Sequence, residues 1–207
     1  MKLNAKEQKA RRDLAKAYHE AFKKEARSSG LSYLKPTPFK RLGDWFVAFY
    51  PSIWTDEVKA EISANVKPYA IDDLFGDILG YPSLVGEPVS LRARGPHCLT
   101  LPMFSAAIES DGDVEAMVQK SKVFMEETLA RVPTLTIDEF IDFSGVDRPA
   151  ERVSENQVVA MILAGRRDEA ARLCELAVAR KQTSSLSGFT PDGERAGLFS
   201  LALRSVS

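Results

Sequence analysis

The chain contains little cysteine and histidine, with two of each among its 207 residues. Cys98 and Cys174 are far apart and neither belongs to a C-x-x-C pair, so no disulfide framework is indicated and a reducing compartment is expected. No apolar run approaches the roughly 18 residues of a membrane helix, and the first residues lack the apolar core of a signal peptide. We therefore expect a cytoplasmic protein with no membrane partner.

Sequence motifs of common enzyme classes are also missing. There is no G-x-S-x-G elbow, no G-x-x-x-x-G-K-[ST] phosphate loop and no G-x-G-x-x-G turn. His97 and Cys98 form the only adjacent pair of metal-type ligands, whereas a zinc site requires three or four ligands. The sequence Asp111-Gly112-Asp113 lacks the other ligands of a calcium loop and is better explained as a helix start. We therefore expect no metal and no cofactor, which favours a chain that is not an enzyme.

The segment from Gly43 to Gly80 indicates the fold class, because it reads as a hairpin followed by a short acidic helix. A first strand, residues 45–50, is aromatic on both faces, and a turn is expected over residues 51–56. The second strand, residues 56–67, alternates strictly, which is typical of a strand with one dry and one wet face. Its apolar face is formed by Val58, Ala60, Ile62, Ala64 and Val66; its polar face by Glu57, Lys59, Glu61, Ser63, Asn65 and Lys67.

The rest of the chain predicts an α+β fold: a small, mostly antiparallel sheet with an N-terminal helix and a C-terminal helical half. Short strands are expected at 89–94, 98–101 and 104–108, and helices at 5–27, 71–79, 114–132, 136–143, 154–165 and 169–181, with a last helix starting at Thr190-Pro191. We expect residues 1–110 to hold the N-terminal helix and sheet. Residues 111–207 are expected to form a helical half packed on them as part of one unit.

Two groups near the predicted hairpin are candidates for binding a protein partner. Three acids lie on the helix 71–79 and three large rings lie on or near the first strand. An acidic patch would speed the capture of a basic partner, and clustered rings are frequent in binding surfaces. The alternatives are structural: acids in the first helical turn favour the helix dipole, and such rings often belong to a core. These candidates are Asp72, Asp73 and Asp77, with Trp45, Tyr50 and Trp54.

A second hypothesis places a small-ligand or catalytic site at Arg92, Arg94 and His97, where two arginines on one strand face could hold a phosphate or carboxylate. His97 would then be the acid–base group, although no nucleophile is visible beside it. The arginines could equally pair with the aspartates of the helix 71–79, and this pairing is the interpretation that we favour.

The charge distribution supports a third, weaker hypothesis. Nine cations and four acids give residues 1–27 a net charge of +5, which leaves −6 for the remainder of a chain whose total is −1. A basic helix on an acidic body is a pattern of nucleic-acid binding. It also fits a solvated helix docked on its own acidic body, and the interspersed acids dilute its field.

The stretch from Leu34 to Gly80 contains LKPTPFKRLGDWF, NVKPY and IDDLFGDILG. It resembles a group of small bacterial proteins, some of which occur beside toxin genes and are thought to act as immunity proteins. The resemblance covers the first half of the chain and carries over no catalytic residue. Since the sequence has no catalytic set and places an acidic helix near aromatic rings, we expect a non-enzymatic, cytoplasmic protein-binding module whose partner is another protein. The resemblance implies that this module is an immunity-type inhibitor.

Overall fold

A computed structural model of the chain describes residues 4–54, 59–81, 85–94, 101–108, 112–146, 152–184 and 186–206. The chain forms two compact units, each built from two separate segments. Unit 1 combines residues 1–66 with 102–134, and unit 2 combines residues 67–101 with 135–207. The units thus interleave in sequence, unlike the single division expected at residue 110.

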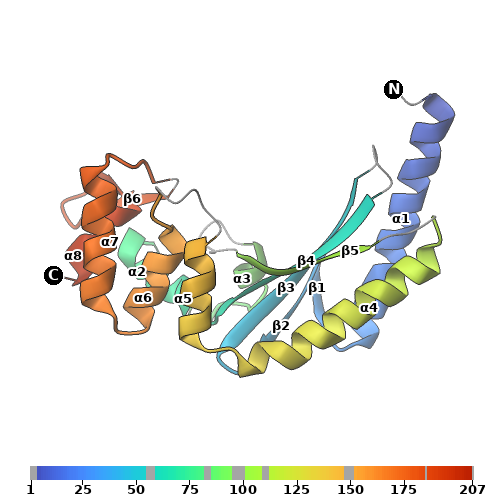
Figure 1. Cartoon of the computed structure of the whole chain (residues 1–207), viewed down its shortest axis with the longest axis horizontal. Coiled ribbons are helices and arrows are strands. Elements are labelled where there is room, and N and C mark those ends of the chain that lie inside the picture. Colours follow the sequence, from blue (N-terminus) through green and yellow to red (C-terminus); the bar gives the residue numbers. More distant parts are fainter. Residues whose placement is uncertain are drawn as a thin grey trace. The chain divides into compact units, whose positions relative to one another are not determined.

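Unit 1 is built on a five-stranded antiparallel sheet whose strands follow one another in the order β1-β2-β3-β4-β5 (Figure 1). Their bounds are β1 Ser32–Leu34, β2 Thr37–Leu42, β3 Trp45–Trp54, β4 Lys59–Pro68 and β5 Pro102–Ile108. The order places β4 between β3 and β5, so β4 has a neighbour on both sides. The α+β fold that the sequence predicts is confirmed.

Two helices run along this sheet, α1 (Ala5–Ser28) and α4 (Val114–Arg131), and a 3₁₀ turn, η1 (Val132–Thr134), follows α4. The helices lie side by side, joined by a buried hydrogen bond of 2.8 Å between the hydroxyls of Tyr18 and Ser121. Phe49 of β3 meets Phe124 of α4 edge to face, with ring centres 6.3 Å apart. The Asp113 carboxylate caps α4, as expected of a helix start there.

The alternation predicted for the second strand is confirmed where the structure describes it. Ala60, Ile62, Ala64 and Val66 are buried, whereas Glu61, Ser63 and Asn65 are half-buried. Val58 and Glu57 lie outside the described residues, as does the side chain of Lys59. One residue contradicts the pattern: Lys67, predicted to face solvent, is 3% exposed. Strand β4 also includes Pro68, one residue beyond the end expected at residue 67.

Other predictions for this part of the chain are wrong. Strands β1 and β2 form a hairpin around Lys35-Pro36, ahead of the first strand that was expected. Pro51, expected in a turn, lies within β3. Leu91–Arg94, expected in a strand, is a single helical turn, α3. The strand expected at residues 98–101 lies outside the described part, except Leu101, whereas the strand expected at residues 104–108 is confirmed as β5.

Unit 2 is mostly helical. Its helices are α2 (Ile71–Leu79), α3 (Leu91–Arg94), α5 (Ile137–Val146), α6 (Glu155–Leu163), α7 (Arg167–Ala179) and α8 (Leu198–Val206). Helix α6 packs against α5, α7, α8 and α2, so it is central to the unit (Figure 1). A capping box opens the helix that was expected from residue 136: the Thr136 hydroxyl accepts from the Glu139 amide at 3.2 Å, and the Glu139 carboxylate accepts from the Thr136 amide at 2.7 Å.

The end of the chain differs from the prediction. Thr190-Pro191 does not begin a helix but stands in the turn of a small hairpin, β6 (Ser187–Phe189) and β7 (Arg195–Gly197), and α8 follows it. The hairpin packs on α2 and α8. Gly188 makes this approach possible, since a Cβ at this position would collide with the backbone of Leu79.

Candidate binding groove

The predicted acidic patch on α2 is largely an internal ion-pair network, defined here as Lys67, Asp72, Asp73 and Arg92. The ammonium of Lys67 lies 2.9 Å from Oδ1 and 2.7 Å from Oδ2 of Asp72, and it also donates to the backbone carbonyl of Arg92 at 2.8 Å. Asp72 is fully buried. A buried charge is tolerated only when it is paired and hydrogen-bonded, and here both requirements are met.

Arg92 completes the network. Its Nη2 donates to both carboxylate oxygens of Asp73, at 3.0 and 2.8 Å, and its Nη1 donates to the Tyr69 carbonyl at 3.0 Å. The guanidinium also lies 4.1 Å from the centre of the Tyr69 ring and 3.8 Å from Asp72. Burial by itself lowers the pKa of Arg92, but the hydrogen bonds to Tyr69 and Asp73 raise it above its ordinary value.

These contacts decide between the two sequence hypotheses for the arginines. The favoured pairing with the aspartates of α2 is confirmed for Arg92, whose donors are directed inward. The side chain of Arg94 and all of His97 lie outside the described residues. Of the three acids, Asp77 alone is exposed, so the predicted acidic face for a basic partner is wrong for Asp72 and reduced for Asp73.

The predicted ring cluster does not form an exposed patch either. Trp45 is buried, Tyr50 is half-buried, and the side chain of Trp54 lies outside the described residues. These rings belong to unit 1, whereas the aspartates belong to unit 2. The core alternative is thus confirmed for Trp45.

A different surface of unit 2 has the features of a binding site. Two hollows of about 520 and 580 Å³ share Lys181, Gln182 and Thr183. Among the described residues that line them there are four cations and no carboxylate. We call the polar lining of the two hollows the basic groove; it consists of Arg152, Arg180, Lys181, Gln182, Thr183, Ser184, Ser187, Ser200 and Arg195.

The loop after α7 forms the centre of the groove, and hydrogen bonds hold its polar side chains in place. Lys181 has a φ of 52°, a left-handed conformation that turns the chain where the helix stops. Gln182 accepts from the amide of Val153 at 2.9 Å and donates to its carbonyl at 2.8 Å. The hydroxyl of Ser184 donates to the buried carboxylate of Glu155 at 2.5 Å. The groove is therefore held to the start of α6.

The hairpin forms another wall. Arg195 of β7 donates from Nε and Nη2 to the hydroxyl of Ser187, at 3.0 and 2.9 Å. Its cross-strand neighbour Phe189 is 57% exposed, and Val178 of α7 is 46% exposed. Among the described residues, neither Lys181 nor Arg195 has an ion-pair partner. Cations beside exposed apolar side chains can bind carboxylates that are carried on a larger ligand.

Sequence reasoning missed this groove, since neither an element nor a site was expected between the helix ending at residue 181 and the one expected to start at Thr190. The available signal was the run Arg180-Lys181-Gln182-Thr183-Ser184 directly after a helix. In the described part of the chain, no three His, Cys, Asp or Glu residues gather as metal ligands, and no helix is long and apolar enough to cross a membrane. Comparisons of the chain with family models, curated proteins and solved structures gave no match.

Proposed function

We propose that the protein is a non-enzymatic protein-binding module whose basic groove takes an acidic segment of a partner protein. The observation that carries this proposal is the groove itself, lined by four cations and no carboxylate among its described residues. The charge of the expected partner is therefore reversed relative to the sequence hypothesis, because Asp72 and Asp73 are occupied inside unit 2.

The composition of the groove favours a protein segment over a small ligand. Small-molecule sites are mostly apolar and surround their ligand, whereas this groove mixes polar and apolar surface, presents four cations and extends over two hollows that share one loop. Exposed Val178 lines one hollow, and exposed Phe189 stands opposite Arg195 in the hairpin, so both offer apolar contacts near cations of the groove. Arginine and aromatic residues are enriched at the centres of protein interfaces.

An immunity-type inhibitor in the bacterial cytoplasm is the form of this module that the resemblance suggests. Such an inhibitor would bind an acidic surface of its toxin through the groove. The buried, unpaired Cys174 agrees with a reducing compartment.

The test compares the full chain with a charge-reversed variant, Arg152→Glu with Arg195→Glu. Both residues line the groove and both are exposed. A matched control, Arg167→Glu with Arg172→Glu, changes the same charge on exposed positions of α7. Capture from the native cell, followed by titration of the purified partner, should give a loss of affinity of at least tenfold for the groove variant alone. Recovery of no stoichiometric protein, or equal losses in both variants, would contradict the proposal.

A further inference from the structure

Helix α1 carries five cations at helical spacing, which we call the basic stripe: Lys9, Arg12, Lys16, Lys23 and Arg27. At about 100° per residue these positions fall on one side of the helix, and at about 1.5 Å per residue the stripe is roughly 27 Å long. The buried residues of α1, Tyr18, Phe22 and Ala26, lie on another side.

The N-terminal half of α1 is unusually free of packing. Its buried residues begin at Tyr18, and from Ala5 to Ala17 every position is exposed or half-exposed. Ala10, Leu14 and Ala17, the small and apolar residues of this half, are therefore not covered within the described part of the chain. The segment does form a helix, because Asn4 and Glu7 make a complete capping box at its start.

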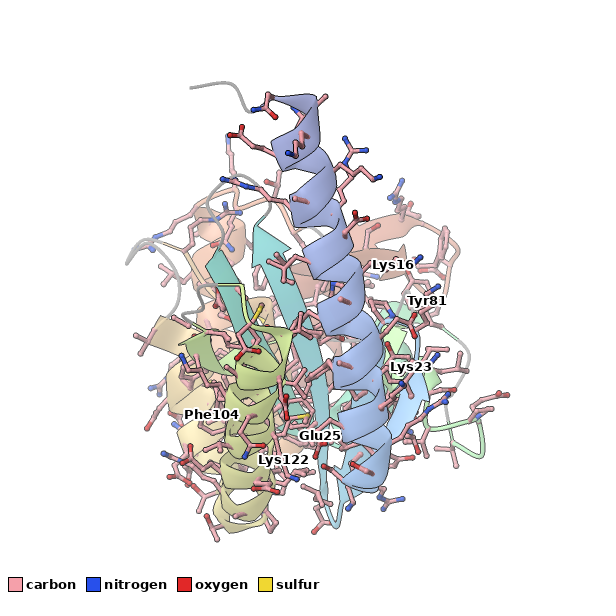
Figure 2. All side chains as sticks on the ribbon, turned by 90° about the vertical axis from the view of Figure 1, so that its right-hand side faces the viewer. Lys16, Lys23, Glu25, Tyr81, Phe104 and Lys122 are labelled. Atoms are coloured by element: carbon pink, nitrogen blue, oxygen red, sulfur yellow. The ribbon has the colours of Figure 1, made fainter. Side chains whose placement is uncertain are left out.

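Two of the four acids counted in residues 1–27 do not face the basic stripe. Glu7 accepts from the Asn4 amide at 2.9 Å as part of the cap. Glu25 pairs with Lys122 of α4 at 2.9 Å. Figure 2 shows Glu25 and Lys122 between the two helices, whereas Lys16 and Lys23 lie on the side of α1 that faces away from α4. Asp13 and Glu20 are the acids that remain near the cations.

The C-terminal end of the stripe is held by contacts with an aromatic ring. The ammonium of Lys23 lies 5.8 Å and the guanidinium carbon of Arg27 5.6 Å from the centre of the Tyr33 ring of β1. Cation–π contacts of this kind attract both cations to the face of the ring. The C-terminal end of the stripe is thus held against β1, whereas its N-terminal end is not packed.

We propose that the basic stripe binds the phosphate backbone of double-stranded nucleic acid without reading its sequence. A duplex carries one negative charge per about 1.7 Å of its axis, so it can face cations along the whole stripe. A basic row along one helix face is the electrostatic footprint of such binding. An anionic membrane fits less well, because Leu14 is the only large apolar side chain from Ala5 to Ala17. This binding is independent of the basic groove.

Fluorescence anisotropy tests the proposal with labelled DNA and RNA duplexes of about 20 base pairs and arbitrary sequence. Contact with about five phosphates predicts a slope of log affinity against log salt of about −4.5, which is a loss of roughly 500-fold between about 50 and 200 mM salt. The variant Lys9→Gln, Arg12→Gln, Lys16→Gln should flatten the slope by about 2.7. The control Arg167→Gln, Arg172→Gln, Arg204→Gln should leave it unchanged.

Lys9→Arg with Lys16→Arg keeps the charge and should retain full affinity, which separates a loss of charge from a loss of folding. Circular dichroism verifies the helix content of each variant. Absence of binding to both duplexes at low salt overturns the proposal, as do equal affinities of the stripe variant and its control. Binding to vesicles of anionic phospholipid without binding to either duplex also overturns it.

Discussion

Unit 2 contains two clusters of charged side chains that use their charges in opposite ways. In the ion-pair network of Lys67, Asp72, Asp73 and Arg92, each charge is matched by a neighbour within the protein. In the basic groove, among the residues that the structure describes, Lys181 and Arg195 have hydrogen-bonding or solvent neighbours but no carboxylate. The paired charges of the network stabilise a particular fold, whereas the charges of the basic groove are available to a ligand.

The comparison teaches that the number of charges in a segment does not identify a binding surface. Asp72 and Asp73 of α2 attract attention in the sequence, yet internal partners offset the cost of burying their charges. The cations after α7 are less conspicuous in the sequence, but their accessible position makes them the better candidates. A charged side chain is a good candidate for binding a ligand when it is not already paired with a counterion of the protein.

Substituting Asp72 by Ala should produce the largest loss of stability. It leaves the ammonium of Lys67, which is 3% exposed, without its counterion. Removing one partner of a buried pair costs about 3–5 kcal/mol. Chemical denaturation measures the loss, and Asp77→Ala on the exposed side of the same helix should stay within about 0.5 kcal/mol.

A double substitution sharpens this test. Lys67→Met with Asp72→Leu removes both charges together, so it should recover much of the stability that Asp72→Ala loses. A loss from Asp72→Ala no greater than that from Asp77→Ala would mean that the network is not the internal element described here.

The apolar interior of unit 1 gives a reference for the charged interior of unit 2. Ile62 of β4 is fully buried, so Ile62→Ala should cost about 2–5 kcal/mol in free energy of unfolding. Glu61 is half-buried on the other face, and Glu61→Ala should change stability by about 0.5 kcal/mol or less. Equal losses in urea denaturation would show that β4 is not a one-sided strand.

Gly188→Ala tests the packing of the hairpin that forms one wall of the basic groove. The added methyl would meet the backbone of Leu79, which cannot rotate away as a side chain can. Overpacking of this kind costs about 1–3 kcal/mol, measured by thermal or chemical unfolding. Gly197→Ala in the same hairpin is the control, since its nearest atom is the Cβ of Ser184 at 3.3 Å and the loss there should be smaller. The reverse ranking would contradict the described packing of the hairpin.

The smallest effect concerns pH. Burial raises the pKa of the Cys174 thiol to about 11, from an ordinary value of 9.0. The unfolded chain therefore loses this proton first as the pH rises, and stability should fall by about 1 kcal/mol per pH unit between those two values. Comparison of the wild type with Cys174→Ala across this window isolates the effect, and identical slopes would contradict it. At neutral pH the native thiol should react slowly with disulfide reagents.

Much of the fold could be predicted because its signals are local. The helix predicted at 71–79 is found with the same bounds, and the alternation of β4 correctly identified a strand with one buried face. The hairpin of β1 and β2 was missed because Pro36 and Pro38 favour extended chain and remove backbone donors. Proline is nevertheless accepted in a turn, where Pro36 lies, and near the start of a strand, where Pro38 lies. The final hairpin was missed because Thr190-Pro191 resembles a helix start equally well.

The candidate site could not be predicted to the same degree, because it depends on contacts between distant segments. The inward position of Lys67 depends on Asp72 and on the carbonyl of Arg92, and sequence alternation contains no information about either contact. The groove brings Arg152, Lys181 and Arg195 together from three segments. A pattern within one segment can predict which face of it is apolar, but not which cations will meet.

The nascent chain leaves unit 1 after residue 66 and returns to it only at residue 102. On the ribosome, β4 is therefore synthesised well before β5, whose Ala106 pairs with Ile62. Until then β4 is an unprotected edge, the kind of strand through which unfinished chains aggregate. Unit 1 is complete only at residue 134, so this edge of β4 stays open until β5 has been synthesised.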